Sequence, residues 1–171
     1  KKYSAAPVSS AHSFIMRMPY RPNDVFDRTL SDFIDMRDNE YLFHAVRTGE
    51  LIQPGMDCIY DESVKNSMDY WAVNIYTRTM INARKKNGIG ERYKHQRIKM
   101  IDKDYFYLEE LYPECLMSNL TRLKDRPVYI TENGCACDDD RMRIIYMIQY
   151  LTALKETMDM GVDVRGYLHW T

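Results

Sequence analysis

The stretch VYITENG, residues 128–134, decides how the rest of the chain is interpreted. Its first four residues are all β-branched or aromatic, which is typical of a short buried strand. Glu132 follows these four residues directly, and Asn133-Gly134 is a dipeptide that favours a tight turn. The sequence therefore predicts a carboxylate presented at the carboxyl end of a buried strand.

Strands and helices alternate on both sides of this stretch. Apolar runs predict strands at residues 8–14, 70–76, 128–131 and 162–170, the first of them weak. Helical spacing and end signals predict helices at residues 23–49, with one possible break, at 113–127 and at 138–161. Such alternation favours parallel strands joined by right-handed helical crossovers.

The predicted helices carry apolar residues three and four positions apart. In the first helix, which Asn23 or Asp24 would cap, the expected buried face consists of Phe26, Leu30, Phe33 and Ile34. The last helix, which Gly161 would end, repeats this spacing at Ile144, Met147, Ile148, Leu151, Leu154 and Met158. Most of the 12 methionines lie on such faces and are expected to fill the core rather than to contact a cofactor.

Four parallel strands and three helices make up half of a (β/α)8 barrel or a small open α/β sheet. An open sheet usually binds a nucleotide at a glycine-rich first turn, and the chain contains neither a GxGxxG motif nor a P-loop. In a barrel, catalytic residues stand at the carboxyl ends of the strands. Because no linker or repeat divides the sequence, we expect residues 1–171 to form a single domain.

Composition and charge argue against nucleic acid or a membrane as the binding partner. The chain has 45% hydrophobic and 29% charged residues, with 24 basic against 25 acidic side chains, so it is expected to be globular without a field that attracts nucleic acid or a membrane. Residues 78–103 contain nine basic and two acidic residues, which we interpret as a surface loop over an active-site mouth. No stretch approaches the roughly 18 apolar residues of a membrane helix, and residues 1–10 lack the apolar run of a secretory signal. These features predict a cytoplasmic protein.

The four cysteines are expected to be free thiols. A chain of this length rarely depends on disulfides, and none of Cys58, Cys115, Cys135 and Cys137 belongs to a CxxC motif. Cys135 and Cys137 would need two further ligands to hold zinc, and no histidine spacing supplies them. We therefore predict no metal and no cofactor.

Several motifs, taken in order, resemble glycoside hydrolase family 1, which includes the β-glucosidases. VYITENG resembles the nucleophile motif of that family, and DYWAVNIYT at residues 69–77 is similar to its strand-six pattern D-F-x-G-x-N-Y-Y-T. LYPECL at residues 111–116 resembles I-Y-P-E-G-L, with Cys115 in place of the glycine. GVDVRGYLHW at residues 161–170 resembles the GV-x-V-x-GY-xx-W of the last strand.

The resemblance implies a TIM barrel, of which this chain resembles the second half, strands five to eight. It also implies a retaining β-glycosidase that hydrolyses a β-linked sugar, with Glu132 as the nucleophile. Tyr76 corresponds to the tyrosine whose hydroxyl contacts that nucleophile, Asn74 to a residue lining the same site, and Trp170 to the aromatic platform under the sugar ring. The alternative for each of these three is a buried strand residue. His12 and His169 lie in predicted strands and either point into the site or serve as structural donors.

The sequence departs from the family where the second carboxylate is expected. Retaining glycosidases need two carboxyl groups about 5 to 5.5 Å apart. The acid/base glutamate of the family lies in an N-E-P motif, which does not occur here. Asn39-Glu40 continues with Tyr41 inside a helical pattern, so it is not assigned that role. We expect the chain alone to be inactive and to need a complementary half-barrel or self-association.

Two alternative functions stay open. A half-barrel exposes strand edges and an apolar face, so it could serve as a non-catalytic carbohydrate-binding or assembly module. The other alternative is a 6-phospho-β-glucosidase. Phospho-specific members commonly follow the platform tryptophan with glycine, whereas Trp170-Thr171 is nearer the serine of the β-glucosidases, which favours an unphosphorylated glucoside or galactoside.

Overall fold

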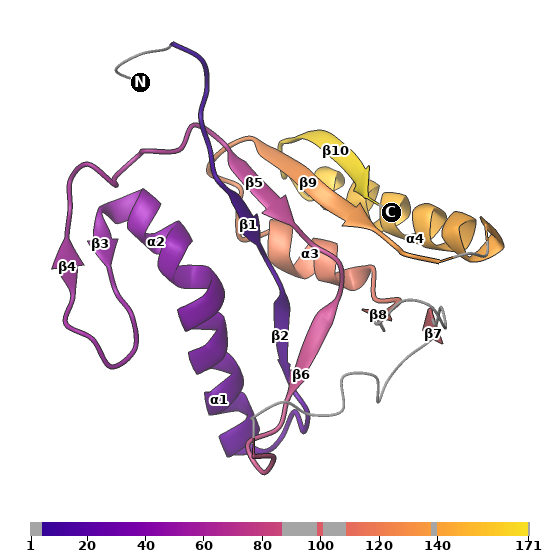
Figure 1. Ribbon diagram of the computed structural model, residues 1–171, viewed down its shortest axis with the longest axis horizontal. Helices are drawn as coiled ribbons and strands as arrows, with labels where there is room; N and C mark the ends of the chain where they lie inside the picture. The colour runs from indigo at the N-terminus through magenta and orange to yellow at the C-terminus, as the bar shows by residue number, and fades with distance from the viewer. Residues whose placement is uncertain (1–4, 87–98, 101–108, 138–139, 171) are drawn as a thin grey trace.

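A computed structural model describes residues 5–86, 99–100, 109–137 and 140–170. Its central sheet contains four strands in the order β1-β5-β9-β10, and every pairing between them is parallel (Figure 1). The strands are β1 (Ala11–Ser13), β5 (Trp71–Asn74), β9 (Val128–Gly134) and β10 (Val164–Trp170). The predicted parallel sheet is confirmed, and its two outer strands are β1 and β10.

The two strands β1 and β5 are each followed by a further strand that the sequence analysis does not predict. β2 (Met16–Pro19) pairs in parallel with β6 (Arg78–Ile81). Between the two pairs, the Phe14 N–H donates a hydrogen bond of 2.9 Å to the Asn74 carbonyl. Two short antiparallel ribbons complete the strands: β3 (Glu50–Leu51) with β4 (Ile59–Tyr60), and β7 (Lys99–Met100) with β8 (Glu109–Glu110).

The first predicted helix is one helical segment with a break in its hydrogen-bond pattern. It consists of α1 (Val25–Asp35), a π-helix η1 (Met36–Glu40) and α2 (Tyr41–Thr48). The Asp24 carboxylate accepts hydrogen bonds from the first N–H groups of α1, as predicted for an N-cap. Gly49 ends α2 with a φ of 86°, a left-handed conformation that glycine adopts without steric cost.

The predicted buried face of α1 is right only in part, because Leu30 and Ile34 are half-buried while the two phenylalanines are not. Phe26 is 69% exposed and Phe33 is 44% exposed, whereas Asp27 and Ser31 are buried. Asp27 tolerates burial because the Arg21 guanidinium binds it through two nitrogens, at 2.7 and 2.8 Å. A satisfied ion pair therefore turns this polar face of α1 toward β2 and β6 (Figure 1).

The remaining helices, α3 (Glu114–Leu120) and α4 (Asp140–Asp159), pack against each other. Of the apolar residues predicted to be buried in α4, Leu154 is buried, but Ile144, Ile148, Leu151 and Met158 are exposed. The buried face instead contains Tyr146 and Tyr150, whose rings stack with centroids 3.9 Å apart. Almost every side of α4 carries apolar residues, so hydrophobicity alone does not choose among them.

The end of β9 differs from the prediction. Glu132, Asn133 and Gly134 belong to the strand instead of following it, and no tight turn forms at Asn133-Gly134. Gly134 is required for another reason: a Cβ atom there would lie 1.5 Å from the Trp170 carbonyl oxygen. The glycine permits close approach of β9 and β10 rather than a reversal of the chain.

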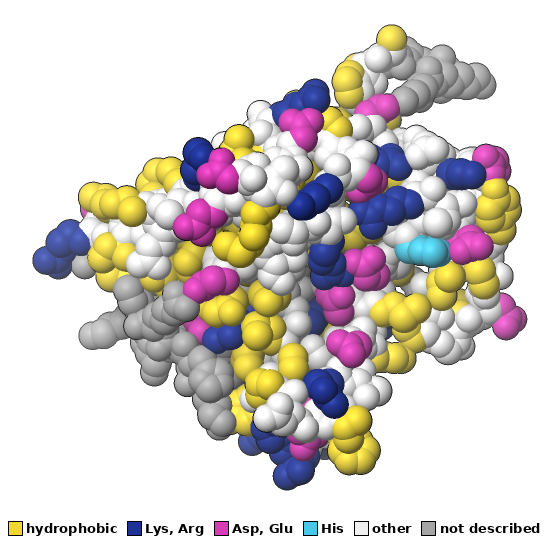
Figure 2. All heavy atoms as spheres, turned by 180° about the vertical axis from the view of Figure 1, so that it is seen from behind, with side chains coloured by type: hydrophobic (Ala, Val, Ile, Leu, Met, Phe, Trp, Pro, Cys, Tyr) yellow, Lys and Arg dark blue, Asp and Glu magenta, His cyan; other side chains and the backbone are white. Residues whose placement is uncertain are grey.

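One hydrophobic cluster connects the sheet to its helices. It includes Phe14, Phe43, Trp71, Ile130 and Tyr146. On the face seen from behind, apolar side chains are interspersed with charged ones (Figure 2). Two methionines of α4 and the turn after it, Met158 and Met160, are at least 43% exposed, so methionine is not only a core residue here. In the part of the chain that is described, no helix has the length and apolar character needed to cross a membrane.

Candidate active site

Glu132 and Tyr76 meet where two neighbouring parallel strands end. Asn74, the last residue of β5, is in register with Glu132 of β9, after a local shift in the pairing. The Ile75 N–H donates to the Glu132 carbonyl at 3.0 Å. The Tyr76 hydroxyl then donates to the Glu132 carboxylate oxygen Oε2 at 2.8 Å. A hydrogen bond to the ionised form stabilises that form and holds the carboxylate in one orientation.

Asn74 is oriented by the residue beside Glu132. The Thr131 hydroxyl donates to Asn74 Oδ1 at 2.6 Å, and the Asn74 side chain is half-buried. Because its oxygen accepts this bond, the amide NH2 group is left as the donor. Backbone pairing places Asn74 beside Glu132, and a side-chain hydrogen bond attaches Asn74 to Thr131, the residue before Glu132.

Trp170 lies at the same end of the sheet as Glu132. It is the last residue of β10 and pairs in register with Gly134, two residues beyond Glu132. Its side chain is 57% exposed. The alternative interpretation of Trp170 as a buried strand residue is therefore wrong. An accessible indole at this position has the surface that a sugar ring needs for stacking.

Asn133 supports the strand from the opposite side, and the sequence analysis does not identify it. Its amide nitrogen donates to the Ile75 carbonyl at 2.6 Å and to the Tyr146 hydroxyl at 2.8 Å. Its amide oxygen accepts from the Tyr167 hydroxyl at 2.6 Å. Burial, with Cys135 as a smaller cause, raises the pKa of Tyr167 to about 12. The alternation of side chains along a strand could have predicted that Asn133 is buried, because the residue next to an outward-facing carboxylate points into the protein.

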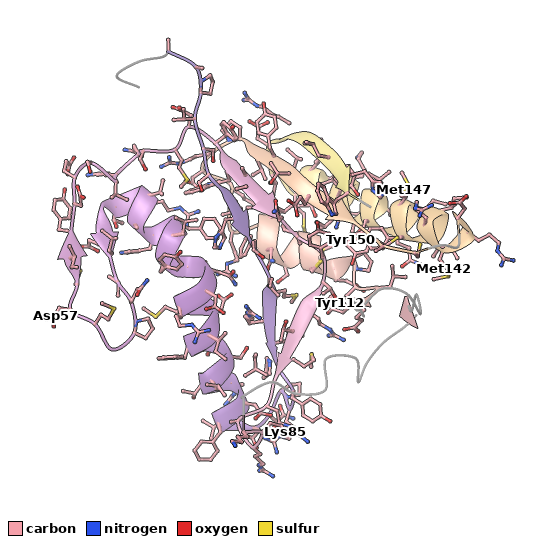
Figure 3. The ribbon with its side chains drawn as sticks, in the orientation of Figure 1. Asp57, Lys85, Tyr112, Met142, Met147 and Tyr150 are labelled. Carbon is pink, nitrogen blue, oxygen red and sulfur yellow. The ribbon has the colours of Figure 1, made fainter. Side chains whose placement is uncertain are left out.

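Tyr150 holds the backbone of Tyr76. Its hydroxyl donates to the Tyr76 carbonyl at 2.5 Å and accepts the Tyr112 N–H at 3.2 Å. Figure 3 labels Tyr112 and Tyr150, which come from the segment before α3 and from α4. The tyrosine that contacts Glu132 is therefore fixed at its backbone as well as at its hydroxyl.

Two other glutamates are engaged in ion pairs elsewhere. Glu40 binds Arg122 in the helical layer, and the neighbouring Asn39 amide donates to the Ile15 carbonyl. Glu110 accepts two hydrogen bonds, of 2.8 and 2.9 Å, from Arg78, and both side chains are buried. Each of these two carboxylates is thus held by an arginine.

The two histidines that were predicted to lie in strands, His12 and His169, have different surroundings. The His12 ring packs edge-on against Phe43, with centroids 5.4 Å apart, and burial lowers its pKa. His169 pairs in register with Asn133, and both of its ring nitrogens are buried without a hydrogen-bond partner among the described residues.

The remaining predictions concern loops and metals. Most of the predicted loop over the active-site mouth, residues 78–103, lies outside the described residues, which here are 78–86 and 99–100. Residues 78–81 form β6 instead of a loop. Its first residue, Arg78, is buried and paired with Glu110 rather than displayed on a surface. Across the described ranges, no three His, Cys, Asp or Glu side chains gather in a group able to hold a metal ion.

The sequence profile of glycosyl hydrolase family 1 matches residues 3–171. The chain belongs to this family. A β-galactosidase of Sulfolobus acidocaldarius is 28% identical over 182 residues, which cover all of this chain and 36% of the relative. A 6-phospho-β-galactosidase of Leptotrichia buccalis is 24% identical, over 91% of this chain and 43% of the relative.

Solved structures agree with the assignment to family 1. The hyperthermophilic β-glucosidase from Pyrococcus furiosus superposes with a TM-score of 0.70 and 26% identity, covering 99% of this chain and 34% of that one. The four-stranded sheet is thus part of a TIM barrel, as predicted. The chain spans about a third of the length of the curated β-galactosidase relative, 36%.

Proposed function

We propose that this chain supplies the nucleophile to a retaining β-glycosidase active site, with Glu132 as the attacking carboxylate. The observation that carries the proposal is the hydrogen bond of 2.8 Å from the Tyr76 hydroxyl to Glu132 Oε2, at the carboxyl ends of two neighbouring barrel strands. Membership of family 1 supports the same reaction class. The proposed substrate is a β-linked glucoside or galactoside.

In the proposed first step, Glu132 attacks the anomeric carbon while the glycosidic C–O bond breaks. Tyr76 occupies Oε2, so Oε1 is the oxygen that forms the glycosyl ester. A second carboxylic acid must protonate the leaving oxygen, and the same group must later take a proton from the water that hydrolyses the ester. The product then keeps the configuration of the substrate, and Glu132 is regenerated.

Asn74 and Trp170 are proposed to bind the sugar. The Asn74 amide NH2 is a hydrogen-bond donor beside the nucleophile, because Thr131 engages its oxygen. The exposed Trp170 indole offers an apolar face to the C–H groups of a sugar ring. Asn74 on β5 and Trp170 on β10 lie on the two strands that neighbour β9, the strand of Glu132.

The acid/base group is proposed to come from a complementary half-barrel or from a second copy of the chain. Glu40 and Glu110 are committed to Arg122 and Arg78, so neither is a candidate in its present contacts. The outer strands β1 and β10 carry the sheet edges that such a partner would pair with. The chain alone is accordingly expected to be inactive.

Trapping of the glycosyl ester tests this proposal. The chain would be co-expressed with the first half of the barrel of the S. acidocaldarius β-galactosidase and treated with a 2-deoxy-2-fluoro-β-glycoside bearing a dinitrophenyl leaving group. We expect the label on the tryptic peptide 125–141, at Glu132, and none in the isolated chain or in Glu132→Gln. Hydrolysis by Glu132→Gln at the rate of the unsubstituted protein would overturn the role of Glu132.

Two alternatives are distinguished by the same preparation. The similarity to a 6-phospho-β-galactosidase favours a phosphorylated sugar, and faster hydrolysis of a 6-phosphoglycoside than of the plain glycoside would establish it. The ion pairs of Glu40 and Glu110 favour a non-catalytic carbohydrate-binding module. Calorimetry would then detect sugar binding, but Glu132 would never accept the label. A cytoplasmic location and a single domain stay predictions, for fractionation and for calorimetric unfolding to test.

A further inference from the structure

Two cysteines follow the nucleophile strand and lie side by side. Cys135 and Cys137 come directly after β9, in a segment without regular secondary structure, and their sulfur atoms are 3.6 Å apart. Both carry thiols. We propose that they are a redox-sensitive pair, which a small peroxide converts to an intrachain disulfide at the base of the Glu132 site.

The distance between the sulfur atoms makes this reaction geometrically accessible. A disulfide bond is about 2.05 Å long, so the two sulfurs must approach by roughly 1.5 Å. Rotation of the two side chains and adjustment of a non-helical, non-strand segment can supply that movement. The ring closed by two cysteines with one residue between them is short, and strained disulfides are more readily reduced again.

Burial is compatible with the oxidised product. Cys135 is 4% exposed and Cys137 is 9% exposed. A disulfide is uncharged and apolar, so it can occupy this position without the desolvation cost of a thiolate. Cys137 is the more exposed of the two and is therefore the thiol that we expect to react first.

The chemistry balances with peroxide as the oxidant. The Cys137 sulfur attacks one peroxide oxygen, the O–O bond breaks, and a sulfenic acid and one water form. The Cys135 sulfur then attacks the sulfenic sulfur, and the hydroxyl leaves with the Cys135 proton as a second water. In total, two thiols and one hydrogen peroxide give one disulfide and two waters, and the pair loses two electrons.

Movement of Cys135 would reach the Glu132 site through one residue, Gly134. Gly134 precedes Cys135 and is packed against the Trp170 carbonyl, where no Cβ would fit. Arg143 donates a hydrogen bond to the Cys137 carbonyl and so ties the other end to α4. We expect closure of the ring between these two contacts to shift Gly134 relative to Trp170.

Peptide mapping tests the pair directly in the full 171-residue chain. After peroxide treatment and alkylation in denaturant without reduction, trypsin releases both cysteines in one peptide, residues 125–141. We expect this peptide to be two hydrogen atoms lighter and unalkylated, and to accept two alkyl groups after reduction. The peptide containing Cys115, residues 104–122, provides the control for a buried thiol and should be alkylated throughout.

Three outcomes would overturn the proposal. They are two alkyl groups on peptide 125–141 after peroxide, irreversible sulfinic or sulfonic acid on either cysteine, and a disulfide between either of them and Cys58 or Cys115. Cys135→Ser and Cys137→Ser should each abolish the mass change, whereas Cys58→Ser should leave it intact.

A second readout tests whether closure reaches the site. In a Trp71→Phe variant, Trp170 is the remaining tryptophan, and its emission should shift on oxidation and return on reduction. The shift should be missing in Trp71→Phe combined with Cys137→Ser. An unchanged Trp170 emission in a protein shown by mass to contain the disulfide would contradict the coupling between the pair and the site.

Discussion

The Trp170 carbonyl oxygen occupies the space that a side chain on residue 134 would need, 1.5 Å from the position of its Cβ. This contact brings β10 against β9 two residues beyond Glu132. Gly134→Ala should therefore separate the two strands and lower the free energy of unfolding by at least about 1–3 kcal/mol, as overpacking typically does. Urea unfolding monitored by circular dichroism measures this loss in the free energy of unfolding.

A matched control for this prediction is Gly55→Ala. Nothing lies within 4 Å of a Cβ at Gly55, and its φ of 82° adds only the backbone strain of a left-handed residue, about 1 kcal/mol. Equal losses in the two variants would show that the approach of Trp170 does not limit residue 134.

Removal of the Tyr76 hydroxyl should affect the chemistry more than the fold. Tyr76→Phe deletes the donor to Glu132 Oε2, and a hydrogen bond to a charged group contributes about 1.5–3 kcal/mol. In the reconstituted enzyme, we expect the rate of glycosyl-ester formation to fall by about 10- to 100-fold. Stopped-flow release of dinitrophenolate gives this rate.

The control for Tyr76→Phe is Tyr60→Phe, which removes an exposed hydroxyl on β4. It should react as fast as the unsubstituted protein. Equal rates for Tyr76→Phe and Tyr60→Phe would mean that the Tyr76 hydroxyl does not orient Glu132.

Asn133 is expected to contribute to stability from beneath the site. Asn133→Ala leaves the hydroxyls of Tyr146 and Tyr167 without the amide that they share. A buried polar group without a partner costs about 1–3 kcal/mol, so a loss of at least this size is expected. Differential scanning calorimetry should show a lower Tm, while Asn23→Ala, at an exposed position, should unfold near the original temperature. A Tm loss no larger than that of Asn23→Ala would contradict this role.

Acid should weaken the attachment of α1. Hydrogen bonding to Arg21, opposed by the cost of burial, lowers the pKa of Asp27 from 3.8 to about 2. The unfolded chain therefore binds a proton at higher pH than the folded chain does. The stabilisation by Asp27 is fully present above about pH 4 and is lost as the pH falls toward about 2.

Thermal unfolding between pH 7 and pH 2 measures this effect. Asp27→Asn should be less stable at pH 7 and should lose less stability between pH 4 and pH 2 than the unsubstituted chain. Asp32→Asn, at an exposed position of α1, should keep the original acid dependence. The same acid dependence in Asp27→Asn and the unsubstituted chain would rule out this ion pair as the cause.

The sequence by itself identified the four strands of the parallel sheet, the helix cap at Asp24, the helix end at Gly49 and the motif residues of the site. The apolar run before Glu132 predicts β9, because a strand buried on both faces has few polar residues. Asp24 and Gly49 mark helix ends through local chemistry, a side-chain acceptor and a permitted left-handed backbone, which needs no distant partner. The family motifs then relate Tyr76 to Glu132 across 56 residues of chain.

Only the tertiary structure decided which faces are buried and how the site is supported. Asp27 is buried because Arg21 neutralises it. Tyr146 lies with Leu154 on the buried face of α4, where the Asn133 amide donates a hydrogen bond to its hydroxyl. Gly134 is required by the Trp170 carbonyl, which approaches from another strand. Each of these outcomes depends on a partner distant in sequence or in another element, and local hydrophobic periodicity contains no information about such a partner.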